Sequence, residues 1–551
     1  MVVNQETMGS LNKSKTGTGM RAISRRQTLK ASGSAGAVIA AAQLPGRAHA
    51  NIEQTLRLVW PYDANSLDPL GMGVQRSTWT VSLHVYDRLL RYDLVKDESG
   101  RSVYNPSKLV GEFVASWHVV DDGKAVDFHI REHAQFHDGS PVTAEDVRWS
   151  IARAMRASAA AAGLFSATGI KSERQLQAVN ERPFRLSLPT ASRYIIPYAA
   201  IFNKNLGLKH VTEGDPWASE WLKTNSAGGG AYKVSSFRPE QVVLTLNENW
   251  RNGFKSLIGR MLFQSVPEAT MRVALVERDA ADAAMEIPPA DSDAVAAWGK
   301  AQALAVAMPN QMEFLGLNSG SAPFNNTAVH QAVAWALPYD DICQKIYQGR
   351  GKKLYGSNTP PIGGEFPQLT VFNTIIEKAK SLLGGASGFT ASLIYSTGKA
   401  GYFDQVALAV KENLSKIGIQ VNIGRLPGSQ FDERIAKRTF DVLVENRTSW
   451  FSMPDYWMRT YYTGTGTNIL GNFQSTVLQD MLNKLRGDAS ESEYAARTKE
   501  MIELVLDEVP LIPTKSQDPQ HPYTQSLVAA VPAFTPRADP DDSMNKASII
   551  H

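Results

Sequence analysis

The pair of residues with the best spacing for chemistry is His133 and His137, in the run EHAQFHD. Two imidazoles four residues apart lie on the same face of a helix or of a strand, and imidazole is a common ligand of transition metals. The same run enters the turn dipeptide Asp138-Gly139, so the pair also fits a surface strand that ends in a turn. We favour the surface strand over a metal site, and we predict no cofactor.

Other patterns that indicate chemistry are weak. The sequence contains no GxxxxGK[ST], HExxH, GxSxG or CxxC motif, which are the local signatures of several enzyme and metal sites. The triple glycine Gly228-Gly229-Gly230 lacks the strand–loop–helix setting of a phosphate-binding loop. We therefore predict a protein that is not an enzyme. An exported hydrolase is the rival hypothesis, and it would need an activated nucleophile and base.

The first 50 residues have the pattern of an export signal. The twin-arginine sequence SRRQTLK is followed by the weakly apolar run ASGSAGAVIAAAQL and by the small-x-small sequence AHA, which ends at Ala50. The apolar run is shorter than the roughly 20 residues that span a bilayer. We predict a twin-arginine signal peptide over residues 1–50 and a periplasmic protein. A basic tail followed by an interfacial helix is the alternative.

Removal of that segment would change the sign of the net charge. The segment holds seven of the 57 Lys and Arg residues and one of the 54 Asp and Glu residues, which leaves 50 basic and 53 acidic side chains, a net charge of −3 in place of +3. A balance so close to zero gives no reason to expect binding to nucleic acid or to an anionic membrane. The single cysteine, Cys343, excludes an intramolecular disulfide, so burial must stabilise the fold.

The clearest helix start lies in FHDGSPVTAEDVRWSIARAM, which runs from Phe136 to Met155. Thr143 is placed to cap a helix, and Asp146 stands three residues later, where a capping box has its acid. Val142 and Val147 flank the cap at the positions of a hydrophobic staple. Apolar residues then recur every four positions, which predicts an amphipathic helix after a turn.

The clearest fold element is a strand, helix and strand over residues 390–423. The helix FDQVALAVKENLSKIG has one apolar face and ends at Gly418, a favoured residue after a helix. That face consists of Val406, Ala409, Val410, Leu414 and Ile417. Elements of these lengths form a right-handed crossover between parallel strands. We predict an α/β fold here and a mixed α+β arrangement over 86–250.

Several segments together resemble the family 5 extracellular solute-binding proteins, the periplasmic receptors of peptide- and nickel-type ABC importers. The most specific segment is LVGEFVASWHVVDDGKAVDFHIREHAQFHDGSPVTAEDVRWSI, residues 109–151. Others follow in family order: SLDPL (66–70), VYDRLLRYD (85–93), NSAGGGAYKVSSFRPEQVVLTLNENW (225–250), PFNNTAVHQAVAWAL (323–337), EKAKSLL (377–383) and DEVPLIP (507–513). The resemblance extends from about Leu56 to about Pro513.

The resemblance implies an α/β protein with a mixed α+β subdomain, in the two-lobed periplasmic-binding-protein type II fold. Lobe I would comprise residues 51–305, with an inserted subdomain at about 86–206. Lobe II would comprise residues 306–511, and the C-terminal segment 512–551 would return to lobe I. The ligand would lie in a cleft between the lobes, where closure excludes water and strengthens polar contacts.

The resemblance also indicates where a ligand would bind. In peptide-binding members, a segment like GWxxDyxDP follows the strand that reads FDVLV here, and its Asp holds the terminal ammonium of the ligand. A buried cation needs such a partner. In this sequence the segment reads ENRTSWFSMPDYW, and Met453 stands at the position of that Asp. Asp455 lies two residues later.

Five residues are therefore predicted to contact the ligand, with core packing as the alternative role of the aromatic ones. They are Trp60, Tyr62, Glu445, Trp450 and Asp455. Trp60 and Tyr62 end the first strand, and aromatic rings there supply apolar area with a polar tip. Glu445 or Asp455 suits a cationic ligand group, whereas Arg447 or Arg459 suits an anionic one.

The function predicted from these features is that of a periplasmic substrate-binding protein. We expect a monomer that captures a peptide or peptide-like solute and delivers it unaltered to an ABC permease complex in the inner membrane. Because Met453 departs from the family pattern, an opine, a sugar conjugate, a modified peptide or a nickel chelate stays open as the ligand. A chaperone or chemoreceptor role on the same scaffold is a further alternative.

Overall fold

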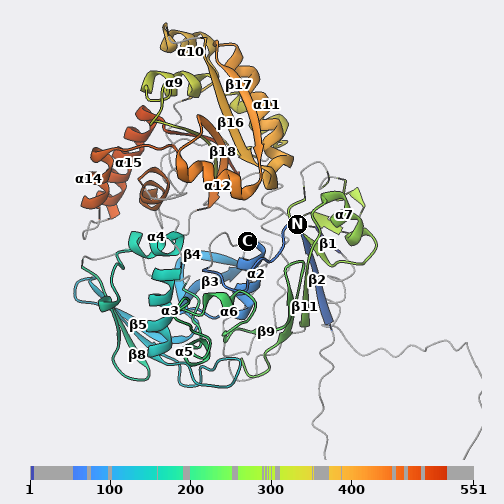
Figure 1. The fold of residues 1–551 in the computed structure, drawn as a ribbon, viewed down its shortest axis with the longest axis vertical. Coiled ribbons are helices and arrows are strands. Elements are labelled where there is room, and N and C mark those ends of the chain that lie inside the picture. The colour runs from blue at the N-terminus through green and yellow to red at the C-terminus, as the bar shows by residue number, and fades with distance from the viewer. Residues whose placement is uncertain are drawn as a thin grey trace, which may run out of the picture.

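The computed structural model shows two bodies, one above the other in Figure 1, each built on one large sheet. It describes residues 2–4, 54–70, 76–96, 102–157, 159–189, 199–250, 258–287, 291, 294–295, 297–298, 301–303, 311–349, 351–352, 372–385, 388–448, 454–463, 470–485 and 491–517. We call the lower body lobe I and the upper body lobe II. Within these residues, no helix is both long enough and apolar enough to cross a membrane.

The main sheet of lobe I has seven strands in the order β13-β1-β12-β2-β11-β10-β9. They are β1 (Val2–Asn4), β2 (Gln54–Trp60), β9 (Tyr232–Arg238), β10 (Gln241–Leu246), β11 (Ile258–Ser265), β12 (Ala283–Ala284) and β13 (Ala301–Ala303). Strand β2 runs parallel to both of its neighbours, β11 and β12. Strand β1 belongs to the predicted signal peptide, so its pairing with β12 and β13 would exist only in the chain before cleavage. The rest of residues 1–50 lies outside the described residues.

A smaller unit is inserted between β2 and β9. It contains the two-stranded sheet β3-β4 and the four-stranded sheet β5-β6-β8-β7. The strands are β3 (Leu90–Lys96), β4 (Ser102–Gly111), β5 (Val114–Val120), β6 (Ala125–Ile130), β7 (Leu176–Ala178) and β8 (Pro183–Ser187). The helices of lobe I are α2 (Arg76–Val85), α3 (Ala144–Ala157), α4 (Ala159–Ala167), η1 (Glu173–Gln175), α5 (Lys204–Leu208), α6 (Ser219–Leu222) and α7 (Ala269–Glu277).

The sheet of lobe II has six strands in the order β15-β19-β14-β18-β16-β17. They are β14 (Gln311–Leu317), β15 (Gly351–Lys352), β16 (Thr390–Ser396), β17 (Gln420–Leu426), β18 (Val442–Thr448) and β19 (Leu511–Gln517). Strand β19 stays in this sheet to Gln517, so a return of the C-terminal segment to lobe I would begin beyond the described residues. The predicted lobe boundaries stay predictions.

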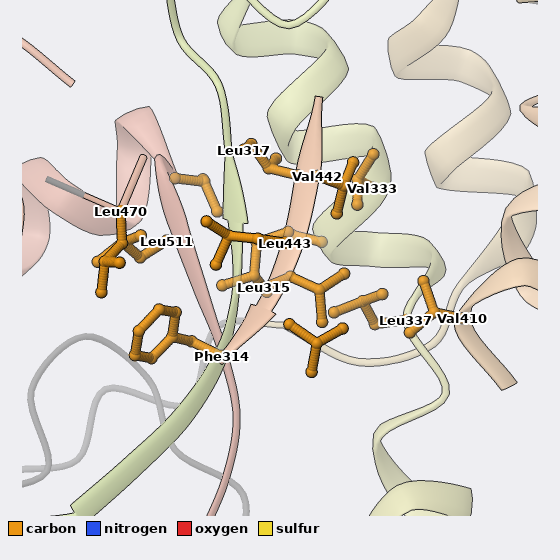
Figure 2. Close-up of a cluster of buried hydrophobic side chains, with 14 of the residues drawn as sticks. Phe314, Leu315, Leu317, Val333, Leu337, Val410, Val442, Leu443, Leu470 and Leu511 are labelled. Carbon is orange, nitrogen blue, oxygen red and sulfur yellow. The ribbon is translucent and has the colours of Figure 1, made fainter. Parts of the chain in front are cut away.

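Helices cover both faces of the lobe II sheet. They are α9 (Thr327–Ala336), η3 (Asp341–Ile346), α10 (Ile376–Leu383), η4 (Thr397–Lys399), α11 (Ala400–Ser415), α12 (Gly428–Lys437), α13 (Pro454–Trp457), η5 (Met458–Tyr462), α14 (Thr476–Lys484) and α15 (Glu491–Glu508). Figure 2 shows how strands β14, β18 and β19 contribute to one apolar core; Phe314, Leu443 and Leu511 point into it. This core fixes the strands whose ends carry the charged residues described below.

Both local predictions are confirmed. The carboxylate of Asp146 accepts hydrogen bonds from the Thr143 amide (2.9 Å) and the Thr143 hydroxyl (2.6 Å) at the start of α3. Val142 and Val147 are buried beside this corner. Strands β16 and β17 are parallel, and α11 connects them.

Candidate ligand-binding site

In lobe II, the carboxyl ends of three strands meet at one edge. Strand β16 is parallel to β17 and to β18, so Ser396, Leu426 and Thr448 end their strands on the same side. Thr448 pairs with Gln311, the first residue of β14. The chain reaches β14 from β13 of lobe I through residues 304–310. This edge therefore lies at the end of lobe II nearest lobe I, where α12 also lies in Figure 1.

Lobe I presents a matching edge. Strand β2 is parallel to β11 and β12, and their carboxyl ends are Trp60, Ser265 and Ala284. The Tyr402 hydroxyl, at the start of α11, donates to the Ile287 carbonyl over 3.4 Å and so joins the two lobes. Helix α4 and η5 form a second contact between them. Ligands of open α/β sheets bind at carboxyl ends of strands, and here two such edges face one another.

The centre of the lobe II edge is a buried carboxylate, Glu445, whose side chain is 3% exposed. Lys399 forms an ion pair with it through Nζ and also donates to the Asn446 amide oxygen over 2.8 Å. The backbone N–H of Asn446 donates to Glu445 Oε1 over 2.7 Å. Burial disfavours the charged carboxylate, but Arg447 and Lys399 outweigh it and hold the pKa of Glu445 below its usual value.

Arg447 lies on the same face of β18 as Glu445, two residues further on. Its Nη2 is 3.5 Å from Glu445 Oε2, and its side chain is 26% exposed. The Nε atom of Arg447 is buried and has no hydrogen-bond partner among the residues that the structure describes. Burial lowers the pKa of Arg447, but Glu445, Tyr461 and Asp432 together raise it by more. The guanidinium is thus charged, and part of its donor capacity is unused.

Asp432 and Tyr461 are two further titratable groups that lie close to Glu445 and Arg447. Burial raises the pKa of Asp432. Burial likewise raises the pKa of Tyr461 to about 12, so the phenol is neutral at physiological pH. Two cations, Lys399 and Arg447, therefore share one fully buried carboxylate, and the exposed carboxylate of Asp432 is close enough to interact electrostatically with Glu445 and with Arg447.

Asp455, the other acidic residue predicted to contact the ligand, has partners within the packing of lobe II. Its Oδ1 accepts the Tyr494 hydroxyl over 2.7 Å, and its Oδ2 accepts Arg459 Nε over 3.2 Å. Asp455 is 4% exposed, and the Arg459 guanidinium also donates to the Leu482 carbonyl. This pair joins α13 and η5 to helices α14 and α15, which makes it a part of lobe II packing.

The aromatic candidates of lobe I lie at the predicted strand end. Trp60 is 5% exposed and stacks on Phe263 with a centroid distance of 5.3 Å, so its ring belongs to the core of lobe I. Tyr62 is half-buried and lies close enough to Arg272 to oppose the lowering of the pKa of Arg272 by burial. Trp450 and Met453 lie outside the described residues, and the prediction for them stays open.

His137 and the triple glycine have structural partners, whereas His133 is exposed in a turn, and the predicted surface strand is reduced to an isolated bridge at Gln135. The His137 ring Nε2 is 3.0 Å from the Gly230 carbonyl, and its backbone N–H donates to the Gly228 carbonyl over 2.9 Å. A Cβ atom on Gly228 would stand 2.1 Å from the Val85 carbonyl oxygen. The triple glycine thus permits close backbone contact. Among the described residues, no three His, Cys, Asp or Glu side chains form a metal-sized cluster.

Lys399 is the residue of this edge that the sequence analysis missed. It follows strand β16 directly, three residues after Ser396. The position itself was the available signal, because residues after the carboxyl ends of parallel strands face the ligand in open α/β sheets. Two parallel strands had been predicted in this region, so the rule was applicable.

The chain matches the model of the bacterial extracellular solute-binding proteins, family 5, over residues 108–468. It is 26% identical over 489 residues to the probable D,D-dipeptide-binding periplasmic protein DdpA of Escherichia coli, which covers 87% of this chain and 90% of that protein. Among solved structures, it resembles Helicobacter pylori DppA in complex with the peptide STSA, with a TM-score of 0.72 and 19% identity over 84% of this chain and 92% of the other. It also resembles AgaA of A. tumefaciens R10 in complex with agropinic acid, with a TM-score of 0.71 and 21% identity over the same shares.

The two facing lobes define a periplasmic-binding-protein type II fold, as predicted. The chain belongs to the bacterial extracellular solute-binding proteins, family 5. Proteins of this family bind solutes outside the cytoplasm, and the family resemblance recognised in the sequence is confirmed.

Proposed function

We propose that this protein is the periplasmic substrate-binding component of an ABC importer and that it binds a peptide or peptide-like solute between its lobes. The observation that carries the proposal is the opposition of two strand-end edges, one with Tyr62 and the other with Lys399, Glu445 and Arg447. Charged groups on a sheet edge provide specific contacts, and closure of the lobes removes those contacts from water. Family membership and the similarity to DdpA support a peptide or peptide-like solute.

A thermal-shift screen followed by calorimetry tests the proposal. The panel contains di-, tri- and tetrapeptides, including D-Ala-D-Ala. A ligand that binds only the folded state raises the melting temperature, by an amount set by the ratio of its concentration to its Kd. We expect at least one peptide to bind with a Kd near micromolar, equivalent to about −8 kcal/mol.

The same samples separate a receptor from a hydrolase. Mass spectrometry of each peptide after incubation with the protein should recover it intact in stoichiometric amount. Catalytic conversion of any bound peptide contradicts a purely binding role.

An opine is the second candidate ligand, because two cations already surround Glu445 and because a similar structure contains agropinic acid. Opines are amino-acid derivatives with additional carboxylates, which suits an edge that carries two cationic side chains. Mannopine-type acids therefore belong in the screening panel.

We further propose export through the twin-arginine pathway and a monomeric state. The sequence SRRQTLK supports the first. Replacement of Arg25 and Arg26 by Lys should keep the protein in the cytoplasmic fraction, and light scattering on the processed protein should give the mass of one chain.

A further inference from the structure

Tyr402 reaches from lobe II to lobe I. It lies in the first turn of α11 and is half-buried, and its hydroxyl donates to the Ile287 carbonyl over 3.4 Å. Burial lowers the pKa of Arg272 in lobe I, and Tyr402 is one of the groups that oppose this shift, so its phenol also lies near that guanidinium. The ring of Tyr402 therefore lies against lobe I beside the carboxyl end of β12.

Lobe II holds this ring in place. The ring of Tyr347 is nearly parallel to that of Tyr402, with an interplanar angle of 7° and a centroid distance of 5.8 Å. Tyr347 is 5% exposed, and its hydroxyl donates to the carboxylate of Glu313. Glu313 belongs to β14, the strand with which the chain enters lobe II from lobe I. A ring that stacks on an anchored neighbour loses little freedom when its hydroxyl forms a bond.

Lobe I holds the acceptor in place in a similar way. Ile287 is 6% exposed and lies three residues after β12. The carbonyls of the two residues before it, Met285 and Glu286, accept hydrogen bonds from the Arg272 guanidinium over 3.0 and 2.9 Å. Donor and acceptor are thus both fixed within their own lobes, which reduces the entropy cost of the contact between them.

The start of α11 also faces the charged edge of lobe II. Lys399, which directly precedes α11, forms an ion pair with Glu445 and donates to the Asn446 amide oxygen over 2.8 Å. Less than one helical turn separates Lys399 from Tyr402. A solute that binds at the charged edge and the contact with Ile287 therefore act on the same short segment of the chain.

We propose that Tyr402 is an interlobe latch, a residue whose hydroxyl binds the Ile287 carbonyl and so stabilises the closed arrangement of the lobes without contacting the solute. The inference rests on the proposed function, because a receptor of this kind retains its solute by closing its lobes. The 3.4 Å distance exceeds the usual 2.5–3.0 Å of an O–H···O hydrogen bond. The latch is thus weak enough to open when the solute is released.

A distance measurement between the lobes tests the latch on the full-length protein. Tyr402→Phe removes the hydroxyl and keeps the ring that stacks on Tyr347. Spin labels at Arg156→Cys and Asp480→Cys occupy exposed positions of α3 and α14, helices that lie away from α11 in Figure 1. Cys343 is buried and should stay unlabelled.

Double electron–electron resonance is recorded with and without each peptide of the screening panel. In Tyr402→Phe the ratio of open to closed lobes should rise about two- to tenfold over that of the unsubstituted protein, the range expected for one neutral hydrogen bond.

Tyr232→Phe is the matched control. The Tyr232 hydroxyl donates to the Ile258 carbonyl over 2.9 Å within lobe I, so this substitution also removes a bond from a tyrosine hydroxyl to an isoleucine carbonyl. It should lower the melting temperature and leave the distance between the lobes unchanged. Tyr402→Phe should show the opposite pattern, because its bond joins the lobes and does not hold either of them together.

Dissociation rates separate a latch from a ligand contact. In Tyr402→Phe every peptide that binds should dissociate faster by the same factor, about two- to tenfold, with association rates kept within about twofold. A loss of affinity confined to particular peptides, at an unchanged distance between the lobes, would make Tyr402 a ligand contact and overturn the latch.

The remaining outcomes distinguish the latch from the proposed function. Identical distance distributions for Tyr402→Phe and the unsubstituted protein in every sample overturn the latch and leave the receptor function intact. The absence of binding by every peptide overturns the proposed function, and a shift toward open lobes in Tyr402→Phe without peptide still supports the latch.

Discussion

The two lobes use buried charges differently. In lobe I, Arg153 and Asp68 form an ion pair of 0% and 2% exposed side chains, and Arg153 Nε also donates to the Trp217 carbonyl over 3.0 Å. The Arg153 guanidinium lies 5.0 Å from the centre of the Phe202 ring. In lobe II, the described residues give Arg447 a 3.5 Å ion pair with Glu445 and no hydrogen-bond acceptor for its Nε. Both arginines lie beside a buried carboxylate, but Arg153 is fully buried and its Nε is hydrogen-bonded, whereas Arg447 is partly exposed.

This difference offers a physical criterion for function. A buried ion pair is costly to desolvate and is tolerated when hydrogen bonds complete it. Arg153 meets that condition inside its lobe, so its charge holds segments together. Arg447 does not, and it lies at an edge that faces the other lobe. If this criterion holds, an ion pair whose donors and acceptors are all satisfied within one lobe should affect stability and leave ligand affinity unchanged. The following substitutions test that expectation.

The largest expected effect is that of Arg153→Met. The change leaves the Asp68 carboxylate buried without its partner, which typically costs about 3–5 kcal/mol. Urea unfolding should show this loss, and peptide affinity of the folded fraction should be unchanged. Arg156→Met, on the same helix but with a 62% exposed side chain, should cost less than about 1 kcal/mol. Equal effects of the two variants would contradict the structural role of Arg153.

Asp455→Asn applies the same test to lobe II. It leaves Arg459 without its counter-ion, and we expect a loss of about 2–4 kcal/mol, with ligand affinity kept within about twofold. Asp480→Asn, on the exposed face of α14, is the control. A large change in affinity without a change in stability would return Asp455 to the ligand site.

The third prediction concerns pH. Burial lowers the pKa of His137 to about 4, whereas an unfolded histidine has a pKa of about 6.5. Between these values the unfolded chain binds more protons, so stability falls as the pH is lowered from about 6.5 to about 4. His137→Gln should reduce this fall by about 1–2 kcal/mol, since partial exposure of the ring weakens the effect.

The measurement is urea unfolding at several pH values, with His118→Gln on an exposed position of β5 as the control. An unchanged pH profile in His137→Gln would show that the ring does not carry this dependence. Ligand preference should not change, because His137 contacts the glycine turn of lobe I.

The smallest loss of stability is expected for substitutions at the start of one helix in each lobe. Thr143→Ala removes the hydroxyl that bonds Asp146 at the start of α3, and Ser475→Ala removes the hydroxyl that accepts the Leu478 amide at the start of α14. Each should cost about 1 kcal/mol in thermal unfolding. A much larger loss for Thr143 would give that corner a role beyond helix capping.

Local features of the fold were predictable because neighbours in the sequence produce them. The cap of α3 depends on Thr143 and Asp146, three residues apart, and the crossover of β16, α11 and β17 depends on contiguous apolar patterns. The residues around Glu445 were not predictable in the same way. Lys399 is 46 residues distant in the chain, and no local pattern connects the two.

The acidic candidates illustrate the same limit. Glu445 begins the segment ENRTSWFSMPDYW and Asp455 lies near its end, and the sequence alone did not show which of the two faces the other lobe. Their partners differ because β18 brings Glu445 to the interlobe edge, whereas α13 turns Asp455 toward Tyr494 and Arg459. The identity of the neighbours, and not the residue type, separates an edge carboxylate from a packing carboxylate.

The sequence by itself determined the family, the α/β class and the corners at which helices begin, because short-range backbone preferences and ordered motifs encode them. Only the tertiary structure decided which charged side chains find ion-pair and hydrogen-bond partners within the fold. Satisfaction of a buried charge depends on donors and acceptors brought together from distant segments, and among the described residues no acceptor meets the Nε atom of Arg447.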